Sequence, residues 1–217
     1  MNKLVLCLSL ALAMCGAAFA QDAPAAAPKA KAKKAAATAA APKAADPKHP
    51  DVPTILERQL NNLEKELVPA AEAMPDDKFN FAPSNALIKG SEFTGVKTYA
   101  LQVRHIAATN QLIAASLNGE PSPLSEKESD LGPEAMTSKA DINAYLKDSF
   151  AKMHTAFGKF TAKNLDEQVR SPFGNGTASR LALTIIVLGH TQDHYGQMVE
   201  YLRMNGIIPP ASRPPAK

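Results

Sequence analysis

The stretch LALTIIVLGHTQDHYGQMVEYLRMNG, residues 181–206, decides the fold. It contains no proline, ends in an Asn-Gly pair and is soon followed by two prolines, a pattern typical of a helix that stops at a left-handed glycine. Its first eight residues are nearly all apolar, which predicts that this half of the helix is buried on most sides. The sequence therefore predicts one long helix over about residues 177–205.

Three earlier segments carry apolar residues at helical spacing, and no segment shows the alternation of a strand. They predict helices over about residues 54–73, 93–117 and 138–160. The first is expected to start at a capping box formed by Thr54 and Glu57, and Pro69 is expected to kink it or end it early. Four such helices predict an all-α four-helix bundle.

The connection over residues 118–137 is long for a helical bundle. Twenty extended residues can reach about 60 Å, more than the length of a 25-residue helix. The third helix can therefore start at either end of the bundle, and a simple up-down-up-down order is not required. The loop is also long enough to cover one mouth of the bundle as a lid.

The N-terminal part of the sequence predicts a signal peptide followed by a disordered tether. Residues 1–20 have a positive start at Lys3, a short apolar core and an Ala-Phe-Ala ending, which predict a signal peptide cleaved after Ala20. Residues 21–50 are almost entirely Ala, Lys and Pro, which predicts a disordered tether. We therefore expect residues 51–217 to form the folded domain of an exported protein, periplasmic or secreted. A lipoprotein anchored at Cys15 is the alternative.

Charge is unevenly placed along the chain. The net charge is +3, but residues 51–217 hold 17 Lys and Arg against 19 Asp and Glu. The expected domain lacks the basic excess of a nucleic-acid-binding protein, so no nucleic-acid partner is predicted. The basic tether at residues 21–50 could contact an anionic surface weakly, although a solvated spacer is the simpler interpretation and the one we favour.

Three histidines carry the predicted chemistry. His190 and His194 are four residues apart and share one helix face, and His105 lies on the apolar face of the second helix. Each is near the middle of its helix, so the three can meet whichever way the helices run. Three imidazoles suit a divalent metal and leave a position for water, the arrangement of reactive rather than structural sites. The alternative is three separate hydrogen-bonded core histidines.

Three further residues are candidates for a catalytic role. Gln197 and Tyr201 follow His194 on the same face, where each could bind a ligand or simply pack. His154 lies at the edge of the apolar stripe of the third helix. It could be a fourth metal ligand or a proton-transfer group, and the alternative is a core residue at the boundary of the stripe.

His105, the His190-x3-His194-x2-Gln197 spacing and the stretch HYGQMVEYLRMNGIIPP at residues 194–210 resemble the DinB-like family of metal-binding four-helix bundles. The resemblance covers about residues 52–210. It implies an up-down-down-up bundle with a divalent metal, commonly zinc or nickel, on the three histidines. Members of this family include thiol-dependent transferases and isomerases that use bacillithiol or mycothiol, and metal hydrolases, so the resemblance implies an activity of one of these kinds.

We therefore expect an exported DinB-like protein that binds a divalent metal and acts as a metal-dependent hydrolase on a small-molecule substrate. One alternative is a thiol-dependent S-transferase or isomerase, which expected export disfavours because those thiols are cytoplasmic. The other is a non-catalytic metal-binding or stress-associated domain. Whether the protein forms a homodimer is left open by the sequence.

Overall fold

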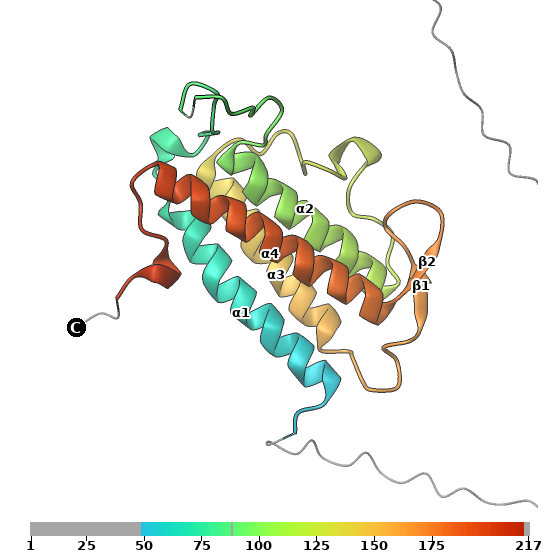
Figure 1. Ribbon diagram of the computed structural model, residues 1–217. Coiled ribbons are helices and arrows are strands. Elements are labelled where there is room, and N and C mark those ends of the chain that lie inside the picture. The colour runs from blue at the N-terminus through green and yellow to red at the C-terminus, as the bar shows by residue number, and fades with distance from the viewer. Residues whose placement is uncertain (1–48, 88, 215–217) are drawn as a thin grey trace, which may run out of the picture. The chain divides into compact units, whose positions relative to one another are not determined.

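Four helices pack as a bundle in the computed structural model, which describes residues 49–87 and 89–214 (Figure 1). They are α1 (Val52–Ala73), α2 (Tyr99–Asn118), α3 (Lys139–Phe157) and α4 (Arg180–Met204). Short 3-10 helices lie at Asp76–Lys78, Glu126–Glu128 and Pro210–Ser212. The prediction of an all-α four-helix bundle is confirmed. The predicted signal peptide with Cys15 and nearly all of the predicted tether lie outside the described residues.

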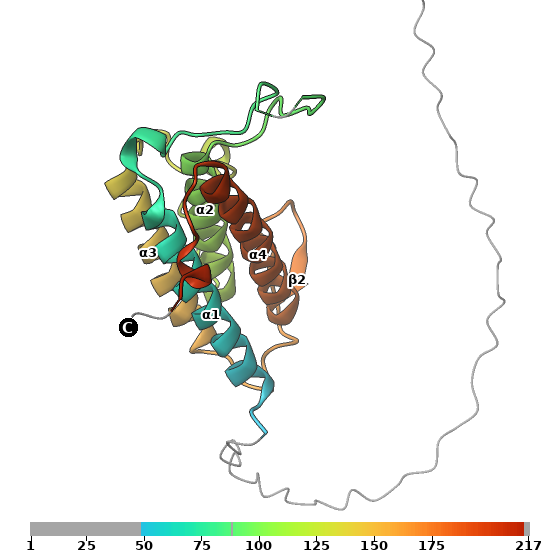
Figure 2. The ribbon, with the colours of Figure 1, turned by 60° about the vertical axis from the view of Figure 1, so that its left-hand side comes forward.

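The helices run up, down, down and up, in the order that the family resemblance implies (Figures 1 and 2). Helices α1 and α2 each pack against both α3 and α4. Helices α2 and α3 are parallel: Asn110 on α2 donates to Ser149 on α3, and further along both helices Lys159, just past α3, reaches Asn118. The loop between α2 and α3 therefore runs back along the bundle. This order leaves α4 antiparallel to α2, which positions the site.

The end of α1 is tied to the start of α2. Tyr99 is fully buried, and its hydroxyl donates to the carbonyl of Ala70 at 2.6 Å. That carbonyl belongs to the last turn of α1, where no helical N–H is available to it. Phe79 packs edge-on against the Tyr99 ring, with centroids 5.8 Å apart. The two ends of the connection are thus tied to the bundle, whereas its middle, over residues 84–87 and 89–96, is mostly exposed and extends away from the helices (Figure 2).

The expected starts of α1 and α2 differ from the structure. Asp51 caps α1 by accepting from the Thr54 N–H at 3.0 Å, so the predicted Thr54–Glu57 capping box is wrong. The helix begins earlier because Pro53 fits its first turn, where its missing N–H costs nothing. Helix α2 begins six residues later than predicted, because Thr98 provides its cap. Pro69 does not end α1, which continues to Ala73.

A two-stranded sheet precedes α4, although no strand was predicted. Strands β1 (Gln168–Arg170) and β2 (Thr177–Ser179) are antiparallel, with Val169 opposite Ala178. The predicted helix start at residue 177 is therefore wrong, and Ser179 caps α4 by accepting from the Ala182 N–H. Strands of three residues are too short to show an alternating pattern.

The interior is a single apolar cluster drawn from all four helices. We predicted that the first half of α4 is buried on most sides, and this prediction is wrong. Ile185 is 60% exposed and Ile186 is 46% exposed. The other end of α4 matches the prediction: Gly206 has φ +73° and follows the last turn. The Ile207 N–H then donates to the Leu202 carbonyl at 2.9 Å, as in a Schellman motif. Among the described helices, none is both long enough and apolar enough to cross a membrane.

Candidate metal centre

The three predicted histidines come together between α2 and α4. His105 comes from α2, and His190 and His194 come from α4. One nitrogen of each ring lies within 4.8 Å of the others, and the ring centroids are 4.5–4.8 Å apart. The Nε2 atoms of His105 and His190 are 2.9 Å apart. The antiparallel packing of the two helices thus brings together histidines that are 85 residues apart in sequence.

Burial keeps two of these imidazoles neutral. His194 is 8% exposed, and His190 is partly buried. Loss of solvent, and to a lesser extent the neighbouring imidazoles, lower the pKa of both His190 and His194 to about 4. Neutral imidazole is the form that binds a metal. At neutral pH these two rings are therefore ready to act as ligands.

A loop residue fixes the orientation of the His105 ring. The Nδ1 atom of His105 contacts the backbone carbonyl of Asp130, and the Asp130 carboxylate lies 3.0 Å away. Both of these groups are acceptors, so Nδ1 carries the proton and Nε2 presents a lone pair. That lone pair faces the Nε2 atom of His190. Lys97 lies 3.8 Å from the same carboxylate.

A chain of side-chain amides leads to the His194 ring. Its Nδ1 atom contacts Oε1 of Gln102, which is buried on α2. The Gln102 amide donates to Oε1 of Gln197 at 2.8 Å, and the Gln197 amide donates to the Asp193 carboxylate at 2.9 Å. The Nε2 atom of His194 is left without a proton, as in His105.

The donor set fits a divalent cation. His105 and His194 both present unprotonated Nε2 atoms, and they do so beside the His190 ring. The remaining nitrogen of His190, Nδ1, is buried and has no hydrogen-bond partner among the described residues. Facing lone pairs repel unless a proton or a cation lies between them. Three neutral nitrogen ligands of this kind suit zinc, nickel or copper.

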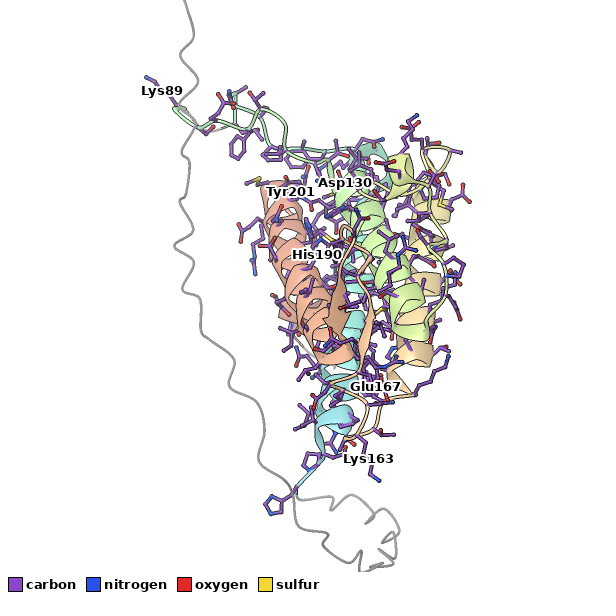
Figure 3. The ribbon with its side chains drawn as sticks, turned by 90° about the vertical axis from the view of Figure 1, so that its right-hand side faces the viewer. Lys89, Asp130, Lys163, Glu167, His190 and Tyr201 are labelled. Atoms are coloured by element: carbon purple, nitrogen blue, oxygen red, sulfur yellow. The ribbon has the colours of Figure 1, made fainter. Side chains whose placement is uncertain are left out.

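Arg104 holds the α2–α3 loop in place beside the site. Its guanidinium donates to the backbone carbonyls of Leu131 and Met136, which lie on either side of a glycine turn. The loop therefore stays close to α2, and Asp130 reaches His105. Figure 3 shows Asp130, His190 and Tyr201 toward the same end of the bundle.

Gly132 allows this close approach, and we expect Gly132→Ala to loosen the loop. Gly132 has φ +70°, and a Cβ there would lie 3.0 Å from Cγ of Arg104 and 3.3 Å from its carbonyl. The strain is worth about 1–3 kcal/mol and falls on the segment that carries Asp130. Hydrogen exchange over residues 126–136 should accelerate about tenfold or more.

The matched control for this change is Gly174→Ala in the β1–β2 turn. Gly174 also has a positive φ, +81°, but nothing lies within 4 Å of its would-be Cβ. It therefore adds backbone strain without touching the loop. Equal exchange rates over residues 126–136 in the two variants would contradict the role given to Gly132.

The three other candidate residues lie outside the histidine cluster. Tyr201 donates to the Lys97 carbonyl at 3.2 Å. Gln197 joins the amide chain just described. His154 faces α1, where its two nitrogens pair with Glu57 at 2.6 Å and with Glu64 at 2.9 Å. Since both ring nitrogens are engaged there, His154 is not a fourth member of the cluster.

Sequence reasoning missed Gln102 and Asp130. Gln102 could have been found, because it is a polar residue between the apolar Leu101 and Val103, three positions before His105, and buried amides need partners. Asp130 left none, because it is one of several acidic residues in a long loop and contacts His105 across 25 positions.

Comparisons with known proteins support the fold. A family model described as the DinB superfamily matches residues 59–198, a range that contains all three histidines. The crystal structure of a DinB-like protein from Bacillus subtilis is similar, with a TM-score of 0.53 and 20% identity, covering 70% of this chain and 92% of that one. A conserved protein from Enterococcus faecalis has a TM-score of 0.53 and 14% identity, covering 71% and 96%. At these identities the two structures support the fold alone. The comparison with curated proteins finds no match.

Proposed function

Because the chain belongs to the DinB superfamily, we propose that it binds a divalent metal, zinc or nickel, through His105, His190 and His194 and uses it in hydrolysis. The observation that carries the proposal is the pair of Nε2 atoms of His105 and His190, 2.9 Å apart with the His194 ring beside them. Without a metal, a proton on the His190 nitrogen can bridge this pair, and a bound cation would take the place of that proton.

The chain's own residues support the metal in two ways. Asp130 and Gln102 accept from the Nδ1 atoms of His105 and His194, which directs the Nε2 lone pairs into the cluster. Burial keeps the rings of His190 and His194 neutral, as ligation requires. When bound, such an ion acts as a Lewis acid that polarises a carbonyl and lowers the pKa of water toward about 7.

A reactive site is favoured over a purely structural one by the number of ligands. Among the residues that the structure describes, the cluster contains three ligand residues, and structural zinc sites use four. His154, the candidate fourth ligand, is held by Glu57 and Glu64 on α1. A three-ligand site leaves a coordination position for water or substrate.

The surroundings of His190 favour a partly apolar substrate. Ile186 lies one turn before His190 on the same side of α4 and is 46% exposed. His190 itself is only partly buried. A ligand that reaches this ring from solvent would therefore contact an apolar side chain next to it.

We also propose that the protein is exported, on the basis of the signal-like residues 1–20. That location supports hydrolysis over transfer from a cytoplasmic thiol. The contact of the tether with an anionic surface and the formation of a homodimer remain proposals that rest on the sequence.

Elemental analysis and an ester screen test the proposal together. We expect the purified chain to carry about one zinc or nickel per molecule, and chelation to abolish hydrolysis of activated esters until the metal is restored. Thiol-transfer substrates are screened in parallel. A chain that neither retains nor takes up zinc, nickel or copper would contradict the metal site. A loaded chain that turns over thiol adducts but no ester would contradict the hydrolase.

A further inference from the structure

We propose that Asp193, acting through Gln197 and Gln102, positions His194 by fixing which of its ring nitrogens carries the proton. The inference rests on the proposed metal site but assigns an orienting role that the family comparison does not give to these residues. It makes Gln102 a positioning residue for a metal ligand on another helix.

The argument begins at the carboxylate, because a carboxylate only accepts hydrogen bonds. The Gln197 amide group must therefore turn its NH₂ toward Asp193, at 2.9 Å. Its carbonyl oxygen then faces Gln102, and that oxygen also only accepts. Gln102 must in turn direct its own NH₂ toward Gln197, at 2.8 Å.

The last step reaches the imidazole. With its NH₂ directed at Gln197, Gln102 can offer only Oε1 to the Nδ1 atom of His194. That nitrogen must then be the protonated one, and the lone pair lies on Nε2, on the side of the other two histidines. A single carboxylate thus sets the orientation of two amides and the tautomer of one ring.

The surroundings of the Gln102 amide oppose its reversal. A reversed amide would set its oxygen against the Gln197 oxygen, two acceptors with no proton between them. Acceptors left without a donor in a buried setting are destabilising.

The burial of these groups distinguishes the chain from a surface network. Gln102 and His194 are buried, Gln197 is partly buried, and Asp193 is exposed. The network therefore runs from solvent to the buried ring, and its starting residue can be changed without disturbing the core. This makes the proposal testable by a surface substitution.

The test compares Gln102→Met with Gln111→Met. Gln111 is an equally buried glutamine on the same helix, and it bonds Asp148 and Lys152 on α3 instead. We expect Gln102→Met to weaken zinc binding about 10- to 100-fold and Gln111→Met to leave it unchanged. Zinc affinity is measured by competition with a chromophoric chelator. Gln102→Glu, which keeps an acceptor for Nδ1, should restore most of the affinity.

The tautomer is read separately in the metal-free protein, by long-range ¹H–¹⁵N correlation of the imidazoles at pH 7.5. We expect His194 to be protonated at Nδ1 in the wild type and in Gln102→Glu, and to lose this preference in Gln102→Met. Asp193→Asn should loosen it in part, whereas Glu200→Gln, a neutralised carboxylate elsewhere on α4, should not.

The two readouts separate this inference from the proposed function. A wild-type chain with the Nδ1–H tautomer but no affinity for zinc would contradict the metal site and leave the positioning role intact. A chain that binds zinc equally well with Gln102→Met and Gln111→Met, with an unchanged tautomer, would overturn the positioning role and leave the metal site intact.

Discussion

Replacing His190 by alanine is expected to abolish stoichiometric metal binding. The wild-type chain should retain about one zinc or nickel ion, and His190→Ala should retain almost none after gel filtration. Four-ligand structural zinc sites contribute roughly 10–16 kcal/mol, so loss of one ligand costs about 3 kcal/mol or more. That energy corresponds to a fall in affinity of more than about 100-fold.

The fold should survive this change, so that lost metal cannot be mistaken for lost structure. His190 is partly buried, and its Nδ1 atom has no partner among the described residues that the change would leave unpaired. Circular dichroism should therefore show the same helical content in the variant.

The matched control is His154→Gln. His154 is also a partly buried histidine, but it pairs with Glu57 and Glu64 on α1 rather than with the cluster. This control should keep its metal in full. Equal metal contents in His190→Ala and the wild type would remove His190 from the site.

The second large effect concerns acid. The metal-free protein is expected to lose stability as the pH falls from about 6.5 to about 4. Burial lowers the pKa of His190 and His194 from 6.5 to about 4, so over this range the unfolded chain binds protons that the folded chain does not. Stability is therefore highest above pH 6.5, and the full loss is present below pH 4.

The size of this loss is limited by coupling between the two rings. A shift of this size in one fully buried group corresponds to about 3 kcal/mol. The repulsion between the two charged rings contributes to both pKa shifts, so adding the two shifts would count it twice. The site also keeps some solvent contact, and we therefore expect a loss of about 3 kcal/mol for the pair together. Urea unfolding of the metal-free chain at several pH values measures it.

Other groups titrate in the same pH range, and their contribution to the pH dependence of stability is removed by comparing the wild type with a variant. His154 acts in the opposite direction, because its two glutamate partners raise its pKa and outweigh burial. Comparison with the His190→Gln/His194→Gln double variant cancels this contribution and that of the carboxylates. The double variant should show a flatter profile between pH 4 and 6.5. Parallel profiles for the two proteins would contradict the assigned pKa shifts.

Much of the fold could be predicted because helical periodicity is a strong signal over 20 residues. The Gly206 end of α4 followed from its Asn-Gly and Pro-Pro punctuation, and the structure places that glycine at φ +73°. Helix starts were harder, since Asp51, Thr54 and Thr98 are all plausible caps in sequence. Which of them caps a helix depends on Pro53 and on where the chain must turn.

The exposure of Ile185 and Ile186 could not be predicted from the apolar run that contains them. A run of apolar residues shows that a segment can be buried, but only the neighbouring helices decide which sides are covered. Helix α4 packs against α1 and α2, and its remaining side stays open.

The meeting of the three histidines was predictable, but the groups around them were not. His190 and His194 share a face by spacing alone, and His105 needed only a middle position on its own helix. Asp130 and Gln102 reach these rings across 25 and 92 positions in sequence. The Asp130 contact depends on the loop that Arg104 holds, and the Gln102 contact depends on the antiparallel packing of α2 and α4.

X-ray absorption at the metal edge of the zinc-loaded chain tests the central claim most directly, because it reports the ligands of the metal itself. The account predicts three imidazole nitrogens at about 2.0–2.1 Å, with the scattering pattern of histidine rings, plus at least one further light atom. In His190→Ala the imidazole contribution should fall or the metal should be absent. A spectrum dominated by oxygen ligands, or with one imidazole at most, would contradict the convergence of the three histidines on a single cation.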